Sequence, residues 1–337
     1  VGETFEWSQH IWYYRDEKSF FVVRITAFFD LFTLHTYSAT ALFYAAFSFS
    51  GLWAMYAAIN TMYHQPKLLA YAILFVPSVV FWGSGILKDT ITLGALGWLT
   101  WATINMVEFR KWSPKYWLIA LCMAWMIFSI KSYIVICYVP LVFVWVYLKQ
   151  VRNIRNTFVK VSVAPILLVV FGALGYFSLE QISSQSDKYS LDSFARQAAV
   201  TAYDIRYGWG ARTGGDGGYD IGLPDGTIGS MVRLMPAAVN VSLFRPYIWE
   251  VRNPLMLLSS LEAMGTVLLT LLVLFKGRFK DLFGDPFLLF CLLFAILFGF
   301  AVGVSTFNFG TLMRYKIPMM MFYFIPLAMA YSHKRLR

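Results

Sequence analysis

The chain has 337 residues, of which 59% are hydrophobic and only 14% are charged, and its mean hydropathy is +0.60. This composition excludes an ordinary soluble domain, in which about a quarter of the residues are charged. The net charge of +10 would suit nucleic acid, but the lysines and arginines lie in short segments between apolar runs, a pattern typical of membrane proteins. We therefore expect a polytopic membrane protein that binds no nucleic acid.

The first apolar segment, from Ser19 to Leu34, also carries Arg24 and Asp30. A helix of this mixed character is typical of the membrane interface rather than of a membrane span. Tryptophan and tyrosine residues precede it, and their rings favour the same interface. The sequence therefore predicts an N-terminal interfacial helix.

About nine further stretches are apolar and long enough to cross a membrane or to lie within a bundle. They occupy residues 38–60, 68–86, 90–107, 116–130, 132–148, 161–180, 255–275, 286–305 and 317–332. The predicted fold class is all-α: a polytopic integral membrane helical bundle in which residues 1–337 form a single transmembrane domain. Residues 181–254, between two of these stretches, are predicted to form one long extracytoplasmic loop.

The basic residues predict the orientation of this bundle. If the basic C-terminus is cytoplasmic, strict alternation of the helices places every short basic loop on the cytoplasmic side. The N-terminal region, the turns at Lys88 and Lys131, the segment around Arg314 and the long loop then lie outside. Most carboxylates lie there as well, so functional residues are expected on the outer side.

A turn rich in polar groups joins the second and third apolar stretches. Lys88 and Asp89 follow Gly83 and Gly85 there, and the two glycines allow the chain to turn at the membrane surface. A lysine and an aspartate at this depth either pair with each other's neighbours or face a polar cavity. The sequence leaves both interpretations open.

Two further basic positions interrupt apolar stretches on the outer side. Lys131 is either a lysine at a helix end whose ammonium reaches the interface, or a cation directed at the same outer cavity as Lys88. Arg314 lies close to Asn308 and Lys316, just before the last stretch. Basic groups that converge on one face would suit an anionic ligand.

The long loop contains mainly arginine among its basic residues, including Arg206, Arg212, Arg245 and Arg252. Guanidinium groups favour bidentate recognition of phosphate or carboxylate. Aromatic residues alternate with these arginines, which would suit a sugar ring, core packing or interfacial anchoring equally well. Arg245, Glu250 and Arg252 lie where the loop returns to the membrane.

Several kinds of site are not predicted. The sequence contains no Ser-His-Asp arrangement and no HExxH helix, and its glycine-rich segment 212–219 lacks the pattern of a phosphate loop. The loop carboxylates Asp216, Asp220 and Asp225 are spaced too irregularly to indicate a metal site. We expect neither a metal nor a cofactor.

Four short segments resemble proteins of bacterial surface-polysaccharide assembly: "FWGSGILKDT", "FSIKSYIVICYVPL", "LFRPYIWEVRNPLMLLSSLE" and "RYKIPMMMFYFIPLAMA". The chain is similar in layout to Wzy-like or EpsG-like polymerases and to the related GT-C glycosyltransferases. The resemblance implies an enzyme of the bacterial inner membrane, with a cytoplasmic C-terminus. Its substrate would be a sugar carried on a polyprenyl phosphate or diphosphate, and its partners would be this lipid-linked saccharide, membrane lipid and, where it is assembled, other subunits.

The same resemblance suggests roles for the outer residues. One carboxylate would accept the proton of the acceptor hydroxyl, with Asp16, Glu17, Asp89 and Glu250 as the candidates. Basic side chains would bind the diphosphate and neutralise charge on the leaving group. The candidates are Lys88, Lys131, Arg206, Arg212, Arg245, Arg252 and Arg314. GT-C enzymes carry their acid after a first helix that this chain does not show, which leaves Asp16 and Glu17 less certain candidates.

Two other classes of function remain open from the sequence. A transporter or flippase of lipid-linked sugar would show broken helices and two matching halves, and we find no such halves. A non-catalytic subunit of a membrane assembly would have no polar cavity and would tolerate substitution of Lys88 or Arg245.

Overall fold

The computed structural model describes residues 16–151, 191–208, 217–276 and 279–332. Within these ranges the chain is helical and contains no strand, apart from an isolated antiparallel bridge between Gly218 and Asn308. Four helices are long and apolar enough to cross a membrane. These observations confirm the predicted class, a helical membrane protein. The chain divides into two compact units, Val1–Val135 and Ile136–Arg337.

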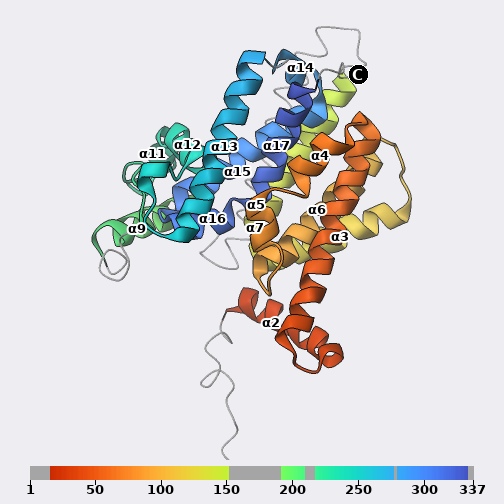
Figure 1. The fold of residues 1–337 in the computed structure, drawn as a ribbon, viewed down its shortest axis with the longest axis horizontal. Helices are drawn as coiled ribbons and strands as arrows, with labels where there is room; N and C mark the ends of the chain where they lie inside the picture. Colours follow the sequence, from red (N-terminus) through yellow and green to blue (C-terminus); the bar gives the residue numbers. More distant parts are fainter. Residues whose placement is uncertain (1–15, 152–190, 209–216, 277–278, 333–337) are drawn as a thin grey trace, which may run out of the picture. The chain divides into compact units, whose positions relative to one another are not determined.

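The first unit contains five complete helices and the first part of a sixth (Figure 1). They are α2 (Glu17–Thr33), α3 (Tyr37–Tyr63), α4 (Pro66–Ile73), α5 (Pro77–Trp82), α6 (Lys88–Val107) and the beginning of α7 (Pro114–Val151). Of these, α3 and α7 are candidate membrane spans. The predicted helix over 68–86 forms two short helices instead, because Pro77 lacks an amide proton and keeps Val76 in an extended conformation.

Small residues bring α3 and α6 close together. A Cβ atom on Gly51 would overlap the carbonyl oxygen of Gly94, and one on Gly97 would overlap the backbone of Gly51. Ser48 also lies against Gly94. Contacts therefore run from Ser48 and Gly94 to Gly51 and Gly97, so the two helices run parallel. Small-residue contacts of this kind allow backbones to pack tightly in membranes, where the hydrophobic effect does not drive helices together.

Lys131 interrupts α7. Its backbone angles, φ −139° and ψ 74°, are not helical, whereas the residues on both sides are helical. The sequence predicts a tight turn here between helices 116–130 and 132–148. The structure has a single kinked element in place of that turn.

The second unit is organised around α15 (Pro286–Thr306), the most apolar candidate span. The other elements, after the end of α7, are α9 (Leu191–Tyr207), α11 (Ile228–Arg233), α12 (Met235–Phe244), the 3-10 turn η3 (Ile248–Glu250), α13 (Pro254–Lys276), α14 (Phe279–Gly284), α16 (Phe309–Tyr315) and α17 (Ile317–Tyr331). Helices α12, α17 and α9 all pack against α15. Buried rings of Trp145, Phe290, Phe294 and Phe322 form its aromatic core.

The region predicted as a long loop is helical over much of its described part. It contains α9, α11, α12 and η3, and Ala195, Met231 and Ala238 from these helices form a buried cluster with Val304 of α15. Alternating charged and apolar residues in α9 concealed this packing at the sequence level. The helix predicted over 161–180 lies outside the described residues.

Candidate functional site

The turn before α6 directs two neighbouring charged side chains to different surroundings. The Thr90 hydroxyl ties this turn by hydrogen bonds to the carbonyl oxygens of Gly85 (2.6 Å) and Trp82 (3.2 Å). Lys88 is the first residue of α6 and reaches α2, whereas Asp89 is buried inside the unit. Residues that are adjacent in sequence therefore belong to two separate polar clusters.

The first cluster consists of Asp16, Ser19 and Lys88, and we refer to it as the outer cluster. The Lys88 ammonium donates to the Ser19 hydroxyl at 2.6 Å and lies 3.5 Å from Oδ2 of Asp16. The Ser19 hydroxyl also donates to Asp16. The side chains of Lys88 and Asp16 are 32% and 51% exposed, respectively. This cluster thus offers an ammonium, a hydroxyl and a carboxylate at an accessible surface.

Asp16 also caps the N-terminus of α2, where its side chain accepts a hydrogen bond from the Lys18 amide. The hydrogen bond from Ser19 and the positive charge of Lys88 lower the pKa of this carboxyl against a smaller opposing effect of burial. Asp16 is therefore ionised at neutral pH and can accept a proton. Its neighbour Glu17 is exposed and makes no hydrogen bond or ion pair with any residue in the described ranges.

The second cluster is the ion pair between Asp89 and Lys131. Both side chains are buried, and the Lys131 ammonium donates directly to the Asp89 carboxylate. The non-helical backbone of Lys131 coincides with this contact. Of the two interpretations that the sequence left open, the structure has the ion pair, which closes both groups off from solvent.

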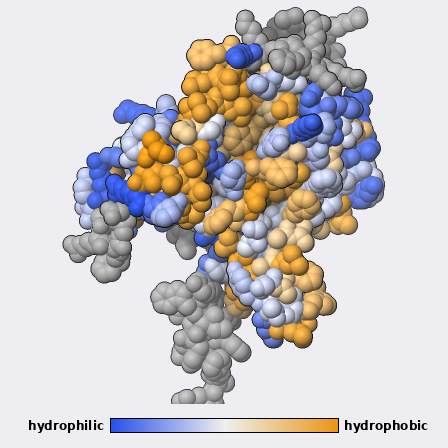
Figure 2. All heavy atoms as spheres, in the orientation of Figure 1, coloured by the Kyte–Doolittle hydropathy of each residue, from blue (hydrophilic) through white to orange (hydrophobic). Residues whose placement is uncertain are grey.

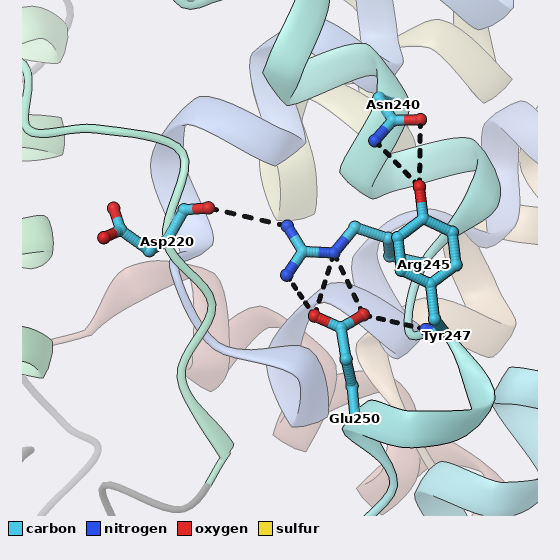
Figure 3. A network of polar contacts seen from close by, with 5 residues as sticks. All are labelled: Asp220, Asn240, Arg245, Tyr247 and Glu250. Atoms are coloured by element: carbon cyan, nitrogen blue, oxygen red, sulfur yellow. Dashed lines mark hydrogen bonds and ion pairs between the residues drawn. The ribbon is translucent and has the colours of Figure 1, made fainter.

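In the second unit, Arg245 and Glu250 form a bidentate ion pair (Figure 3). The Arg245 Nε donates to both Glu250 carboxylate oxygens, at 3.0 and 3.1 Å, and its Nη2 donates to Oε1. Nη1 lies 3.5 Å from the Asp220 carbonyl oxygen. We call this arrangement the Arg245 clasp, because it joins the chain after α12 to the η3 turn and to the segment at Asp220.

The clasp uses most of the hydrogen-bonding capacity of both charged groups. Glu250 also accepts the Tyr247 amide at 2.8 Å, and the Tyr247 hydroxyl contacts Asn240 at 3.2 Å (Figure 3). Burial alone would raise the pKa of Glu250, but the hydrogen bonds from Arg245 and Tyr247 outweigh burial and lower it. A carboxylate held in this way is a poor proton acceptor, so the clasp supports the backbone rather than reacting.

The remaining predicted site residues are dispersed in the second unit. Arg206 of α9 forms an exposed ion pair with Asp220 at 2.9 Å, and the charge of Arg252 acts on Glu250. Arg314 lies in the last turn of α16 and is partly buried. Arg212 lies outside the described residues. The structure thus brings Asp16 together with Lys88, Asp89 with Lys131, and Arg245 with Glu250.

Three polar residues of these networks were not among the predicted site residues. Ser19 bridges Asp16 and Lys88, and its position three residues after a capping aspartate was the available signal. Lys316 is completely buried, with its ammonium 3.5 Å from the Arg245 carbonyl oxygen and close enough to Glu262 for their charges to interact. The Tyr219 hydroxyl bonds Gly303 and Phe307 at the end of α15, a contact between distant segments that the sequence does not signal.

Comparison with protein families, with curated proteins and with solved structures found no significant match. The function of the chain is therefore argued from its own geometry.

Proposed function

We propose that the chain is a membrane-embedded glycosyl-transferring or polymerising enzyme that uses a sugar linked to a polyprenyl phosphate or diphosphate. The observation that carries this proposal is the outer cluster, in which an ionised carboxylate and an ammonium lie beside each other at an accessible surface. Glycosyl transfer requires both groups: a base for the acceptor hydroxyl and a cation for the departing phosphate.

Each residue of the outer cluster has a role in this proposal. Asp16 accepts the proton of the acceptor hydroxyl while the acceptor oxygen forms a bond to the anomeric carbon of the donor sugar. The bond from that carbon to the phosphate oxygen breaks, and the electron pair leaves with the phosphate. Lys88 compensates the negative charge that develops there. Ser19 orients both groups through its two hydrogen bonds.

The buried ion pair and the Arg245 clasp have supporting roles in this proposal. Asp89 and Lys131 fix the first turn of α6, from which Lys88 extends. Arg245 and Glu250 hold the chain between α12 and α13. We also retain as proposals the arrangement of nine spans, a location in the bacterial inner membrane and a cytoplasmic C-terminus. Lipid-linked saccharide and partner subunits remain proposed partners.

Complementation in the native host tests the proposal. A strain that lacks the gene would carry wild type, Asp16→Asn or Lys88→Met at matched membrane abundance, and surface polysaccharide would be resolved by gel electrophoresis. We expect each variant to reduce polymer formation by about 10²-fold or more, the usual contribution of a general base or of a charge-stabilising group. Lys88→Arg keeps the charge and should retain part of the activity.

Glu17→Gln provides the matched control, because Glu17 adjoins Asp16 in α2 but takes no part in the outer cluster. This variant should form polymer at the wild-type level. Loss of polymer in Glu17→Gln with retention in Asp16→Asn would assign the base to the wrong residue. Unchanged polysaccharide in the deletion strain would refute the proposed function and leave the transporter and assembly-subunit hypotheses.

A further inference from the structure

Helix α2 has apolar side chains on two opposite faces. On one face, Val22, Ile25 and Phe29 pack with Tyr44 of α3, Ile91 of α6 and Ile130 of α7 in one buried cluster. On the other face, no described residue covers Phe28, Leu31 or Phe32, and Leu31 and Phe32 are 72% and 66% exposed. A helix at a water surface would carry polar residues on this second face. The exposed face of α2 therefore needs an apolar environment.

The exposed apolar surface continues around the turn into α3. Leu34, in the turn, is 84% exposed, and Tyr37 and Leu42 at the start of α3 are 69% and 70% exposed. Ring contacts connect the two helices, from Phe32 to Phe28, on to Phe29, and from Phe29 to Phe43 of α3 at 5.4 Å. Figure 2 shows hydrophobic surface over this end of the α2–α3 hairpin.

Polar side chains of the hairpin are satisfied internally. The Thr40 hydroxyl donates to the Asp30 carboxylate at 2.7 Å, and the hydroxyls of Thr33 and Thr40 are 2.7 Å apart. Thr26 is bonded to the Val22 carbonyl and to the Tyr44 hydroxyl. The exposed ring of His35 lies 3.8 Å from Asp30. Internal pairing is what a lipid environment demands, because lipid tails offer no hydrogen-bonding partners.

The charged residues of α2 are concentrated in its other half. Asp16, Glu17, Lys18 and Arg24 precede the exposed apolar residues, and Asp30, bonded to Thr40, is the single charged residue of the second half. Polarity thus changes along the axis of the helix rather than around it. A helix that lies flat in the membrane interface would instead show a polar and an apolar face along its whole length.

We propose that the end of the α2–α3 hairpin, residues 28–43, is inserted into one leaflet of the lipid bilayer. Lipid is the occupant that the surface fits, because the exposed rings continue onto α3, a candidate span of 27 residues. At 1.5 Å per residue α3 is about 40 Å long, whereas the hydrocarbon core is about 30 Å thick. Both ends of α3 can therefore reach a headgroup region while the hairpin end contacts lipid tails near the boundary.

Spin-label accessibility on the full chain tests this inference. Exposed Cys122 is first replaced by serine, and single nitroxide labels are then attached at Leu34→Cys, Leu31→Cys and, as an aqueous reference, Lys111→Cys. The protein is reconstituted in vesicles of phosphatidylcholine with a minor fraction of phosphatidylglycerol. Collision rates with oxygen, which partitions into lipid, are compared with those of a water-soluble nickel chelate.

Labels at Leu34 and Leu31 should collide preferentially with oxygen, and the label at Lys111, in an exposed basic loop, preferentially with the nickel chelate. Nickel access at Leu34 equal to that at Lys111 would place the hairpin end in water and overturn the inference. Low collision rates with both reagents would show that a second copy or another protein covers the surface, which also overturns it. Because all labelled positions are exposed, a folded protein is expected in each case, and the result does not depend on whether the chain transfers sugars.

Discussion

Lys88 and Asp89 are adjacent on the first turn of α6, yet the protein uses their charges differently. Lys88 reaches an accessible carboxylate and hydroxyl, whereas Asp89 pairs with Lys131 in a region closed to solvent. An accessible ion pair contributes little to stability because water competes for both charges. A buried pair contributes little relative to an apolar core but is costly to break. The two clusters therefore predict different consequences of substitution.

Removal of one partner of the buried pair should destabilise the protein. Lys131→Met leaves the buried Asp89 carboxylate without its ammonium, and we expect a loss of about 3–5 kcal/mol in the free energy of unfolding. The double variant Asp89→Asn with Lys131→Met should recover part of that loss, since neither charge remains. Apparent melting temperatures in detergent would measure this coupling. A double variant as unstable as the sum of both single variants would contradict the assignment.

The outer cluster predicts a pH effect. The Ser19 hydrogen bond is the main cause of the lowered pKa of Asp16, so Ser19→Ala should raise that pKa towards its ordinary value. Because Asp16 acts in its ionised form, activity falls as the pH drops through its pKa. The acid limb of the activity profile should therefore move to higher pH in Ser19→Ala, while activity at high pH is reduced less. An unshifted acid limb would indicate another base.

At the scale of helices, the parallel pair α3 and α6 determines where the outer cluster forms. Gly51, Gly94 and Gly97 allow the two backbones to approach. Tyr44 of α3 and Ile91 of α6 then pack in one cluster with α2. The start of α2 consequently lies within reach of Lys88. Close packing between α3 and α6 is thus a condition for the proposed site.

Gly51→Ala should separate α3 from α6, because the added Cβ atom would overlap the Gly94 carbonyl. We expect a loss of about 1–3 kcal/mol, the usual cost of overpacking. Gly265→Ala in α13 is the matched control, since no atom lies within 4 Å of its added Cβ. It should be neutral or stabilise the helix by up to about 1 kcal/mol. Thermal melting of both variants would compare them, and equal effects would contradict the close approach.

At the scale of the whole molecule, the question is which surfaces face each side of the membrane. Four helices qualify as spans by length and composition, while several other apolar helices, such as α17 with 15 residues, are shorter. The distribution of basic loops predicts that the loop after α6 is cytoplasmic and that the segment around Asp225 is outside. Both positions lie in described and exposed parts of the chain.

Cysteine labelling in intact cells would measure this orientation. With Cys122 replaced by serine, Asp225→Cys should react with a membrane-impermeant maleimide added from outside. Lys111→Cys should react only after the cells are permeabilised. The reverse pattern would invert the topology and would move the outer cluster, which the alternation rule places on the same side as Asp225, to the cytoplasmic face.

Part of the candidate site could be predicted from particular residues. Asp89 and Lys131 were identified because charges within apolar stretches are costly and need partners, but their pairing across 42 positions depends on how α6 and α7 pack. Arg245 and Glu250 lie five positions apart, and their local contact was within reach of sequence reasoning. Ser19 was missed because a single hydroxyl carries little signal until its neighbours are placed.

The sequence by itself determined the class of the protein, a helical membrane protein, because apolar length and low charge leave the backbone no other way to satisfy its hydrogen bonds in lipid. It also determined most helix positions outside the loops. The tertiary structure decided which charges meet, that α9, α11 and α12 fold where a loop was predicted, and that α2 buries one apolar face and exposes the other. These features depend on contacts between distant segments, and composition and periodicity do not encode which segment a given apolar face will meet.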